Sequence, residues 1–162
     1  MGVAAPVGVC NGRNVTHAGE VEHPTSAVAR TLGVVLAGWG GANVVGGTGL
    51  AVSGRGVTSS AFGQQSAAWG AINLAIAGVG WWRSRRAGVD LPRLRTILLV
   101  NAALDVGYLG VGTALVASGW GQDDAHAAAR RGHGAAVMVQ GAALLALDVA
   151  FAGVATRAMR AR

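Results

Sequence analysis

The chain has 162 residues, of which 52% are hydrophobic and only 12% are charged, and its mean hydropathy is +0.45. Average soluble domains carry charge on about a quarter of their residues, so this composition points away from a soluble domain and toward a membrane protein. The net charge is +6, and all thirteen basic residues are arginine. Because these arginines stand between apolar segments and form no stripe interleaved with aromatic residues, the sequence argues against nucleic-acid binding.

Residues 1–28 are polar, glycine-rich and aperiodic, and they lack the basic-then-apolar layout of a signal peptide. We interpret this segment as a flexible cytoplasmic tail. It contains Cys10, the single cysteine of the sequence. One cysteine excludes an intrachain disulfide, a CxxC redox pair and a cysteine-based metal site.

Four long runs with almost no charge follow the tail. Residues 31–54 and 56–82 contain no charged residue, 96–122 contain only Asp105, and 132–156 contain only Asp148. Each run exceeds the roughly 20 residues that span a hydrocarbon core of about 30 Å, and none shows the recurring charged face of a soluble amphipathic helix. The sequence therefore predicts an all-α polytopic membrane protein, an up-down bundle of four transmembrane helices. We place the transmembrane domain at 29–157, its helices at about 31–53, 60–82, 96–119 and 133–156, and a basic cytoplasmic tail at 158–162.

The distribution of arginine predicts the orientation. Most arginines fall in the connection at 83–95, after the fourth run or just before the first, whereas the other side has only Arg55, Arg130 and Arg131. Loops rich in Lys and Arg remain in the cytoplasm. We therefore predict a multi-pass protein of the cell (inner or plasma) membrane with both termini in the cytoplasm.

Polar residues within the runs fall on helical stripes. Asn101, Asp105 and Tyr108 are spaced by four and three positions and so share one helix face. At about 1.5 Å per residue from the nearest cytoplasmic arginine, Asn73, Asp105 and Asp148 lie about 15 Å deep and Asn43 about 20 Å. The predicted intramembrane polar cluster consists of Asn43, Asn73, Asn101, Asp105, Tyr108 and Asp148. A second, outer polar layer about 25 Å deep would contain Gln65 and Gln140.

Small residues four positions apart allow helix backbones to approach closely. Three such rows are present: Gly33, Ala37 and Gly41; Ala67, Ala71 and Ala75; and Gly110, Ala114 and Ser118. The segments 39–43 and 69–73 also resemble each other, since both begin with Trp-Gly and end with Asn. These rows predict tight packing without indicating which helices touch.

The intramembrane polar residues leave two functional interpretations. In the favoured one, their side chains bond across helices and stabilise a structural or accessory membrane protein. Its partners would be the lipid bilayer and either a second copy of the chain or another membrane subunit. In the alternative, Asp105 and Asp148 bind a proton, a cation or a polar ligand in a small transporter or proton- or cation-linked carrier.

Catalytic motifs are missing from the sequence. It has no Gly-x-Ser-x-Gly elbow and no lysine for a Walker-type loop. His17 and His23 fall in the tail, and His126 and His133 fall in or beside the predicted outer loop, where they cannot ligate a haem between helices. We expect no enzymatic activity, no metal site and no cofactor.

Three motifs carry a resemblance to a known family. They are Trp69-Gly70-x-x-Asn73, Asn101-x-x-x-Asp105-x-x-Tyr108, and Gln140-Gly141 with Asp148. With these motifs the chain, over about 30–156, resembles a family of small bacterial four-helix membrane proteins of unknown function. The resemblance implies an architecture but no reaction, and the N-terminal tail lies outside it.

Overall fold

The computed structural model describes residues 24–53 and 55–161 of the chain. They form four α-helices, and no strand occurs in these two stretches: α1 (Pro24–Val52), α2 (Val57–Ala87), α3 (Leu91–Ser118) and α4 (Ala125–Arg160). The predicted all-α class with four helices is confirmed. Cys10, His17 and His23, and the predicted tail up to residue 23, lie outside the described residues.

The helices continue past the predicted spans, chiefly at the arginine-rich end. The first helix begins at Pro24, within the segment expected to be tail, and α2 continues to Ala87. Likewise α3 begins at Leu91 and α4 continues to Arg160. The predicted bounds were placed at charged residues, but arginine is a good helix former. A change from apolar to charged sequence therefore marks a change of surroundings and does not end the helix.

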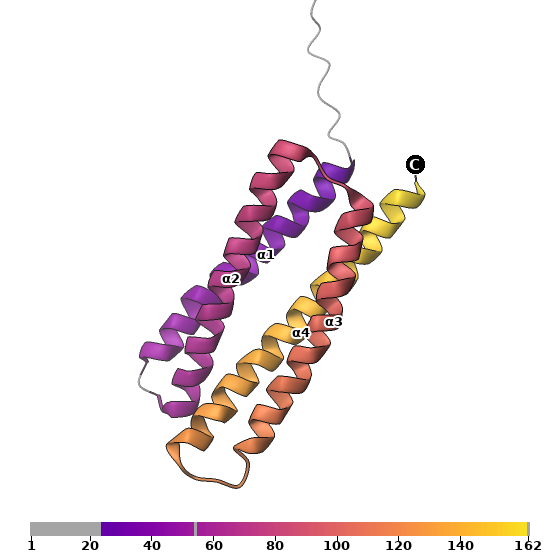
Figure 1. Ribbon diagram of the computed structural model, residues 1–162. Helices are drawn as coiled ribbons and strands as arrows, with labels where there is room; N and C mark the ends of the chain where they lie inside the picture. Colours follow the sequence, from indigo (N-terminus) through magenta and orange to yellow (C-terminus); the bar gives the residue numbers. More distant parts are fainter. Residues whose placement is uncertain (1–23, 54, 162) are drawn as a thin grey trace, which may run out of the picture.

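Two antiparallel hairpins make up the bundle. Helix α1 packs along α2, and α3 packs along α4 (Figure 1). The hairpins join mainly through α2 and α4, which run in the same direction, while α1 contacts α4 over a shorter stretch. The chain therefore runs up and down through four neighbouring helices. One end of the bundle contains the C-terminal ends of α2 and α4 and the N-terminal end of α3.

Glycine residues make the contacts within each hairpin. A methyl group on Gly70 of α2 would lie 2.5 Å from the carbonyl oxygen of Gly40 on α1, and one on Gly40 would lie 2.8 Å from the carbonyl oxygen of Gly70. Two helical turns further along α1, Gly47 and Gly63 of α2 face each other in the same way, since a methyl group on either would meet the carbonyl oxygen of the other. Since 40 and 47, and 63 and 70, are each seven positions apart, the seam follows every second helical turn.

The second hairpin repeats this arrangement. Gly112 of α3 and Gly134 of α4 each face the other's backbone, and a methyl group on Gly141 would lie 3.2 Å from the carbonyl oxygen of Asp105. By contrast, a methyl group on Gly33, Gly41 or Gly110, which belong to the predicted four-residue rows, would meet no described atom within 4 Å. Small residues do carry the packing, but at seven-residue intervals. Of the predicted rows, Ala67 lies in this seam, since a methyl group on Gly47 would come within 2.6 Å of its backbone nitrogen, whereas Gly33, Gly41 and Gly110 lie outside it.

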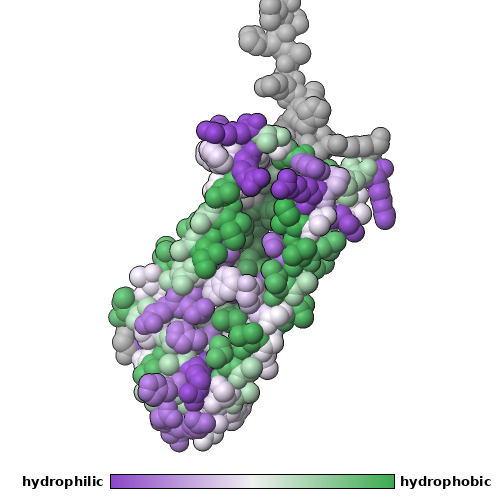
Figure 2. Space-filling model, viewed as in Figure 1, coloured by the Kyte–Doolittle hydropathy of each residue, from purple (hydrophilic) through white to green (hydrophobic). Residues whose placement is uncertain are grey.

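The distribution of side chains is inverted relative to a soluble bundle. Large aliphatic residues point outward, as for Val45, 76% exposed, and Val106, 58% exposed, and several buried side chains are polar. Figure 2 shows hydrophilic residues concentrated toward the two ends of the molecule and hydrophobic ones along the sides between them. Monomeric soluble proteins rarely expose so much contiguous apolar surface.

Three helices, α1, α3 and α4, are long and apolar enough to cross a membrane. Helix α2 has no charged residue from Val57 to Trp82, but its serine, glutamine and asparagine residues lower its apolar content. The prediction of four apolar spans is therefore supported for three of the four helices.

Two aspartates cap helices at the loops. The carboxylate of Asp90 accepts a hydrogen bond from the backbone N–H of Arg93 at the start of α3, and that of Asp124 accepts one from Ala127 at the start of α4. The bond from Ala127 stabilises the charged carboxylate and lowers the pKa of Asp124. Its contribution to stability is present above the unfolded pKa and is lost as the pH falls through the folded pKa.

The glycine seam can be tested with a matched pair of variants on α2. We expect Gly70→Ala to destabilise the bundle by about 1–3 kcal/mol, because its methyl group would press on the α1 backbone. The control is Gly78→Ala, where a methyl group meets no described atom within 4 Å and helix propensity adds up to about 1 kcal/mol. The melting temperature of each variant is measured in detergent from the helical circular dichroism signal. Equal melting temperatures for the two variants would contradict the close contact.

Candidate functional site

A chain of hydrogen bonds crosses the bundle at the side chain of Gln140, which is 1% exposed. Its Oε1 accepts a bond of 2.9 Å from the indole Nε1 of Trp39, and its Nε2 donates to Oδ1 of Asn43. The amide of Asn43 also donates from Nδ2 to the backbone oxygen of Trp39, at 2.8 Å. Both ends of the Gln140 amide are therefore bonded to α1, and this contact links the first helix to the last.

This contact joins residues that the sequence predicted in two layers. The depth estimate placed Gln140 in an outer layer with Gln65 and placed Asn43 in the central cluster. The estimate counted from a different arginine in each helix, so a shift of one helix along another does not enter it. The offset of about one helical turn is bridged by the long side chain of Gln140, so Gln140 and Asn43 lie together.

Two buried carboxyl groups lie between α3 and α4. Asp105 and Asp148 are both buried, and their side chains are close enough to interact electrostatically. They occupy the same seam as the glycines, since Asp105 lies seven positions before Gly112 and Asp148 seven after Gly141.

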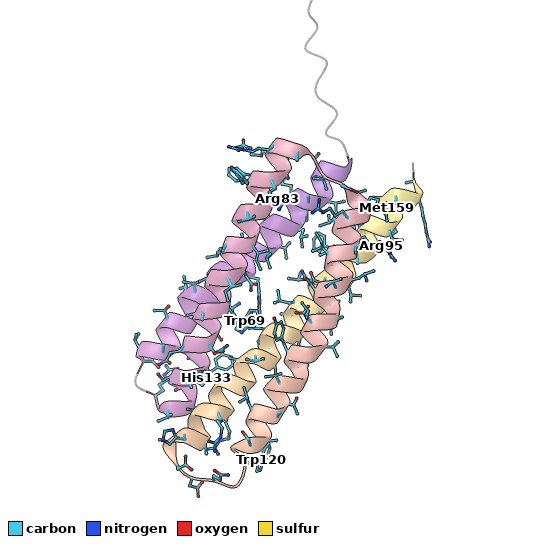
Figure 3. All side chains as sticks on the ribbon, in the orientation of Figure 1. Trp69, Arg83, Arg95, Trp120, His133 and Met159 are labelled. Atoms are coloured by element: carbon cyan, nitrogen blue, oxygen red, sulfur yellow. The ribbon has the colours of Figure 1, made fainter. Side chains whose placement is uncertain are left out.

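Two aromatic rings lie in contact between α2 and α3, about one helical turn from Asp105. The centroids of Trp69 and Tyr108 are 5.0 Å apart, with the rings edge to face at 73°. Figure 3 shows Trp69 directed from α2 toward the other hairpin. Asn73 is one turn from Trp69 on α2, and Asp105 is one turn from Tyr108 on α3, both toward the arginine-rich end. The helical geometry therefore brings Asn73 to the same level as the carboxyl pair.

Buried polar atoms without a protein partner lie at this level and, on α2, about two turns away at Ser66. Among the described residues, Nδ2 of Asn73 and Oδ2 of Asp105 are buried without a hydrogen bond, as is Oγ of Ser66 on α2. Asn73 is 1% exposed and Asp105 is 3% exposed. Buried donors and acceptors that remain unpaired cost free energy. Asn73 Nδ2 is a donor, and Asp105 Oδ2 accepts a hydrogen bond when it is not protonated.

The remaining predicted residues lie at the margin. Asn101 precedes Asp105 by one turn on α3 and is half-buried, and Gln65 on α2 is half-buried as well. Ser66 is buried although the sequence did not single it out, and Trp39, which is half-buried and bonded to Gln140, was not placed in the predicted cluster. Trp39 lies four positions before Asn43 on the same helical stripe, and this spacing was the signal that could have identified it. Ser66 carries no comparable signal.

The chemistry available to this cluster is hydrogen bonding and proton exchange. Within residues 24–53 and 55–161, no group of three or more His, Cys, Asp or Glu side chains is placed to hold a metal ion. The cluster combines amide, carboxyl, phenol and indole groups, which can bond across helices or bind a small polar species.

Comparison with known proteins assigns the chain to a family. Residues 35–149 match the sequence profile of a family of unknown function (DUF6992). The chain belongs to this family. The match confirms the predicted resemblance to a family of unknown function, and it includes every residue of the predicted cluster from Asn43 to Asp148. No curated protein and no solved structure shows a significant match to this DUF6992 chain.

The bond chain at Gln140 gives the second testable prediction. We expect Gln140→Leu to lower the stability of this DUF6992 protein by about 1–3 kcal/mol, because it leaves the Trp39 indole and the Asn43 amide without their partner in a buried site. Gln65→Leu makes the same chemical change at a half-buried position and serves as the control. Thermal unfolding in detergent measures both, and a Gln140→Leu protein as stable as the Gln65→Leu protein would reject the assigned role.

Proposed function

We propose that this DUF6992 protein is an integral membrane protein whose four helices all span the bilayer. The observation that supports this most is the inverted distribution of side chains, with valine, isoleucine and leucine outside and amide and carboxyl groups inside. In water this arrangement would expose the apolar surface and bury the polar one. In lipid the same arrangement is favourable.

Helix α2 belongs among the spanning helices in this proposal despite its lower apolar content. Its polar residues Ser66 and Asn73 are buried against other helices, while Ile72, Ile76 and Val79 are exposed. Polar groups cost little in a membrane when they face the bundle interior. What lipid would meet along this part of α2 is therefore aliphatic.

The orientation follows from the charges at the two ends. Seven described arginines lie at the end formed by α2, α3 and α4: Arg83, Arg85, Arg86, Arg93, Arg95, Arg157 and Arg160. The opposite end carries Arg55, Arg130 and Arg131 together with Asp123 and Asp124. The positive-inside rule supports a cell-membrane protein with its arginine-rich end and both termini in the cytoplasm.

Within the membrane, we propose a structural or accessory, non-enzymatic role. The hydrogen bonds that join Gln140 to Trp39 and Asn43 connect the two hairpins, and the side chains of Asp105 and Asp148 interact between α3 and α4. Interhelical bonds of this kind stabilise bundles by about 0.6–2 kcal/mol each. The bilayer is one partner in this proposal, and a second copy of the chain or another membrane subunit is the other.

One observation favours a second candidate function, a proton- or cation-linked carrier. The level of Asp105 and Asp148 also contains unpaired atoms of Asn73 and Asp105, which suit a transient polar occupant. Two shallow hollows of about 410 Å³ each adjoin Gly56 and Val57 at the opposite end, and neither is lined by Asp105 or Asp148. A carrier would have to open a path to the pair that these hollows do not provide.

Cysteine labelling of intact cells tests the membrane proposal and its orientation. In a Cys10→Ser background, a cysteine introduced by Ser84→Cys should be protected from an impermeant maleimide, because Ser84 lies at the proposed cytoplasmic end. A cysteine introduced by Gln122→Cys, in the α3–α4 connection, should be labelled. Reversed labelling would overturn the orientation, and a chain that stays monodisperse without detergent would overturn membrane insertion itself.

Substitution of Asp105 separates the two candidate functions. Asp105→Asn keeps the size and hydrogen-bonding capacity of the side chain but cannot exchange a proton at neutral pH. If the pair is structural, we expect the variant to fold with near-normal stability and to leave any cellular phenotype unchanged. Proton uptake into liposomes by the wild type, abolished by Asp105→Asn and unaffected by the exposed control Asp90→Asn, would instead establish the carrier.

A further inference from the structure

The two hairpins separate toward the arginine-rich end. Helix α2 has buried residues up to Ala77, yet it continues to Ala87 without another one. At the opposite end the hairpins are in tight contact, since a methyl group on Gly132 of α4 would meet Ala61 and Phe62 of α2 within about 3 Å. The bundle is therefore closed at one end, and at the other end it has an opening between the hairpins, which Figure 2 shows as a hollow.

The opening has apolar walls and a basic rim. Figure 2 shows a hollow between the hairpins in this half of the molecule, with hydrophobic side chains on both sides and hydrophilic ones at its mouth. Figure 3 places Arg83 on α2 and Arg95 on α3, on the two sides of the opening. In the part of the chain that the structure describes, Asp90 is the acidic residue at this end, against the seven arginines named above. An electrostatic attraction for anions follows.

Three of these arginines have defined positions. The guanidinium of Arg85 lies 4.5 Å from the ring centroid of Trp81, and that of Arg86 lies 4.3 Å from that of Trp82. The Nε of Arg95 donates a hydrogen bond of 2.9 Å to Oγ1 of Thr156 on α4. Tryptophan prefers the level of lipid headgroups, and arginine binds phosphate through paired N–H donors. Tryptophan rings thus hold Arg85 and Arg86, and α4 holds Arg95, at the end of the bundle that would lie at the depth of headgroup phosphates in the proposed membrane.

We propose that the opening between the hairpins binds a phospholipid with an anionic headgroup. The acyl chains lie between the apolar walls, and the headgroup phosphate binds the arginines at the rim, with Arg83 and Arg95 on its two sides. This inference rests on the proposed insertion into the membrane. A free phosphate ion would satisfy the arginines but leave the apolar walls unfilled, so a lipid fits both features of the opening.

Lipid retention by the purified full-length chain tests this site. Native mass spectrometry would compare phosphatidylglycerol with phosphatidylcholine carrying the same acyl chains, and we expect preferential retention of phosphatidylglycerol. The double variant Arg83→Gln/Arg95→Gln should weaken that affinity by about 30-fold at low salt, at about fivefold per arginine. The double variant Arg55→Gln/Arg130→Gln removes the same charge from the opposite end and should bind like the wild type.

Further measurements complete the test. If loss of the Arg95 bond to Thr156 unfolds the double variant, Arg83→Gln alone should still weaken binding by about fivefold. Glycerol phosphate has the same phosphate chemistry without acyl chains and should not displace the lipid. Equal retention of both lipids, equal losses in the two double variants, or displacement by glycerol phosphate would each overturn the lipid site. None of these results affects membrane insertion, which fails only if the chain is monodisperse without detergent.

Discussion

Backbone contact at glycine is the constraint on which the rest of this structure depends. Gly40 faces Gly70, Gly47 faces Gly63, and Gly112 faces Gly134, each without room for a methyl group. Helices this close leave little interior volume for aliphatic side chains, so the larger ones point outward. The apolar exterior and the narrow, partly polar interior therefore have the same origin.

The position of the carboxyl pair follows from the same seam. In the seven-residue pattern of α3 and α4, Asp105 and Asp148 stand at positions that glycine occupies elsewhere. Their side chains therefore lie close together at a point where the helices are close. Gln140 is the neighbour of seam residue Gly141, and its side chain reaches across to Trp39 and Asn43 on α1. The polar groups thus supply directional contacts where a large hydrophobic core cannot form.

The two ends of the bundle differ in a way that matters for function. Near Gly132 the hairpins touch backbone to backbone, while beyond Ala77 of α2 they separate below a rim of arginines. The buried carboxyl pair lies between these regions. This asymmetry bears on the proposed carrier role and on the proposed lipid site, because any ligand that approaches the carboxyl pair between the hairpins would come from the open end.

From the sequence alone, the charge-free runs predicted the number and approximate location of the helices. A helix with apolar surroundings on all sides needs a continuous segment without charged residues. Spacing within each helix likewise predicted that Asn73, Asp105 and Asp148 each lie on a polar stripe of their own helix. Only the tertiary structure decided that Gln140 meets Asn43, that Gly40 and Gly70 pack while Gly33 and Gly41 do not, and that the hairpins separate at one end. These features depend on the rotation, stagger and crossing angle of whole helices, which are set by contacts between residues 16 to 101 positions apart. No local pattern in the sequence records them.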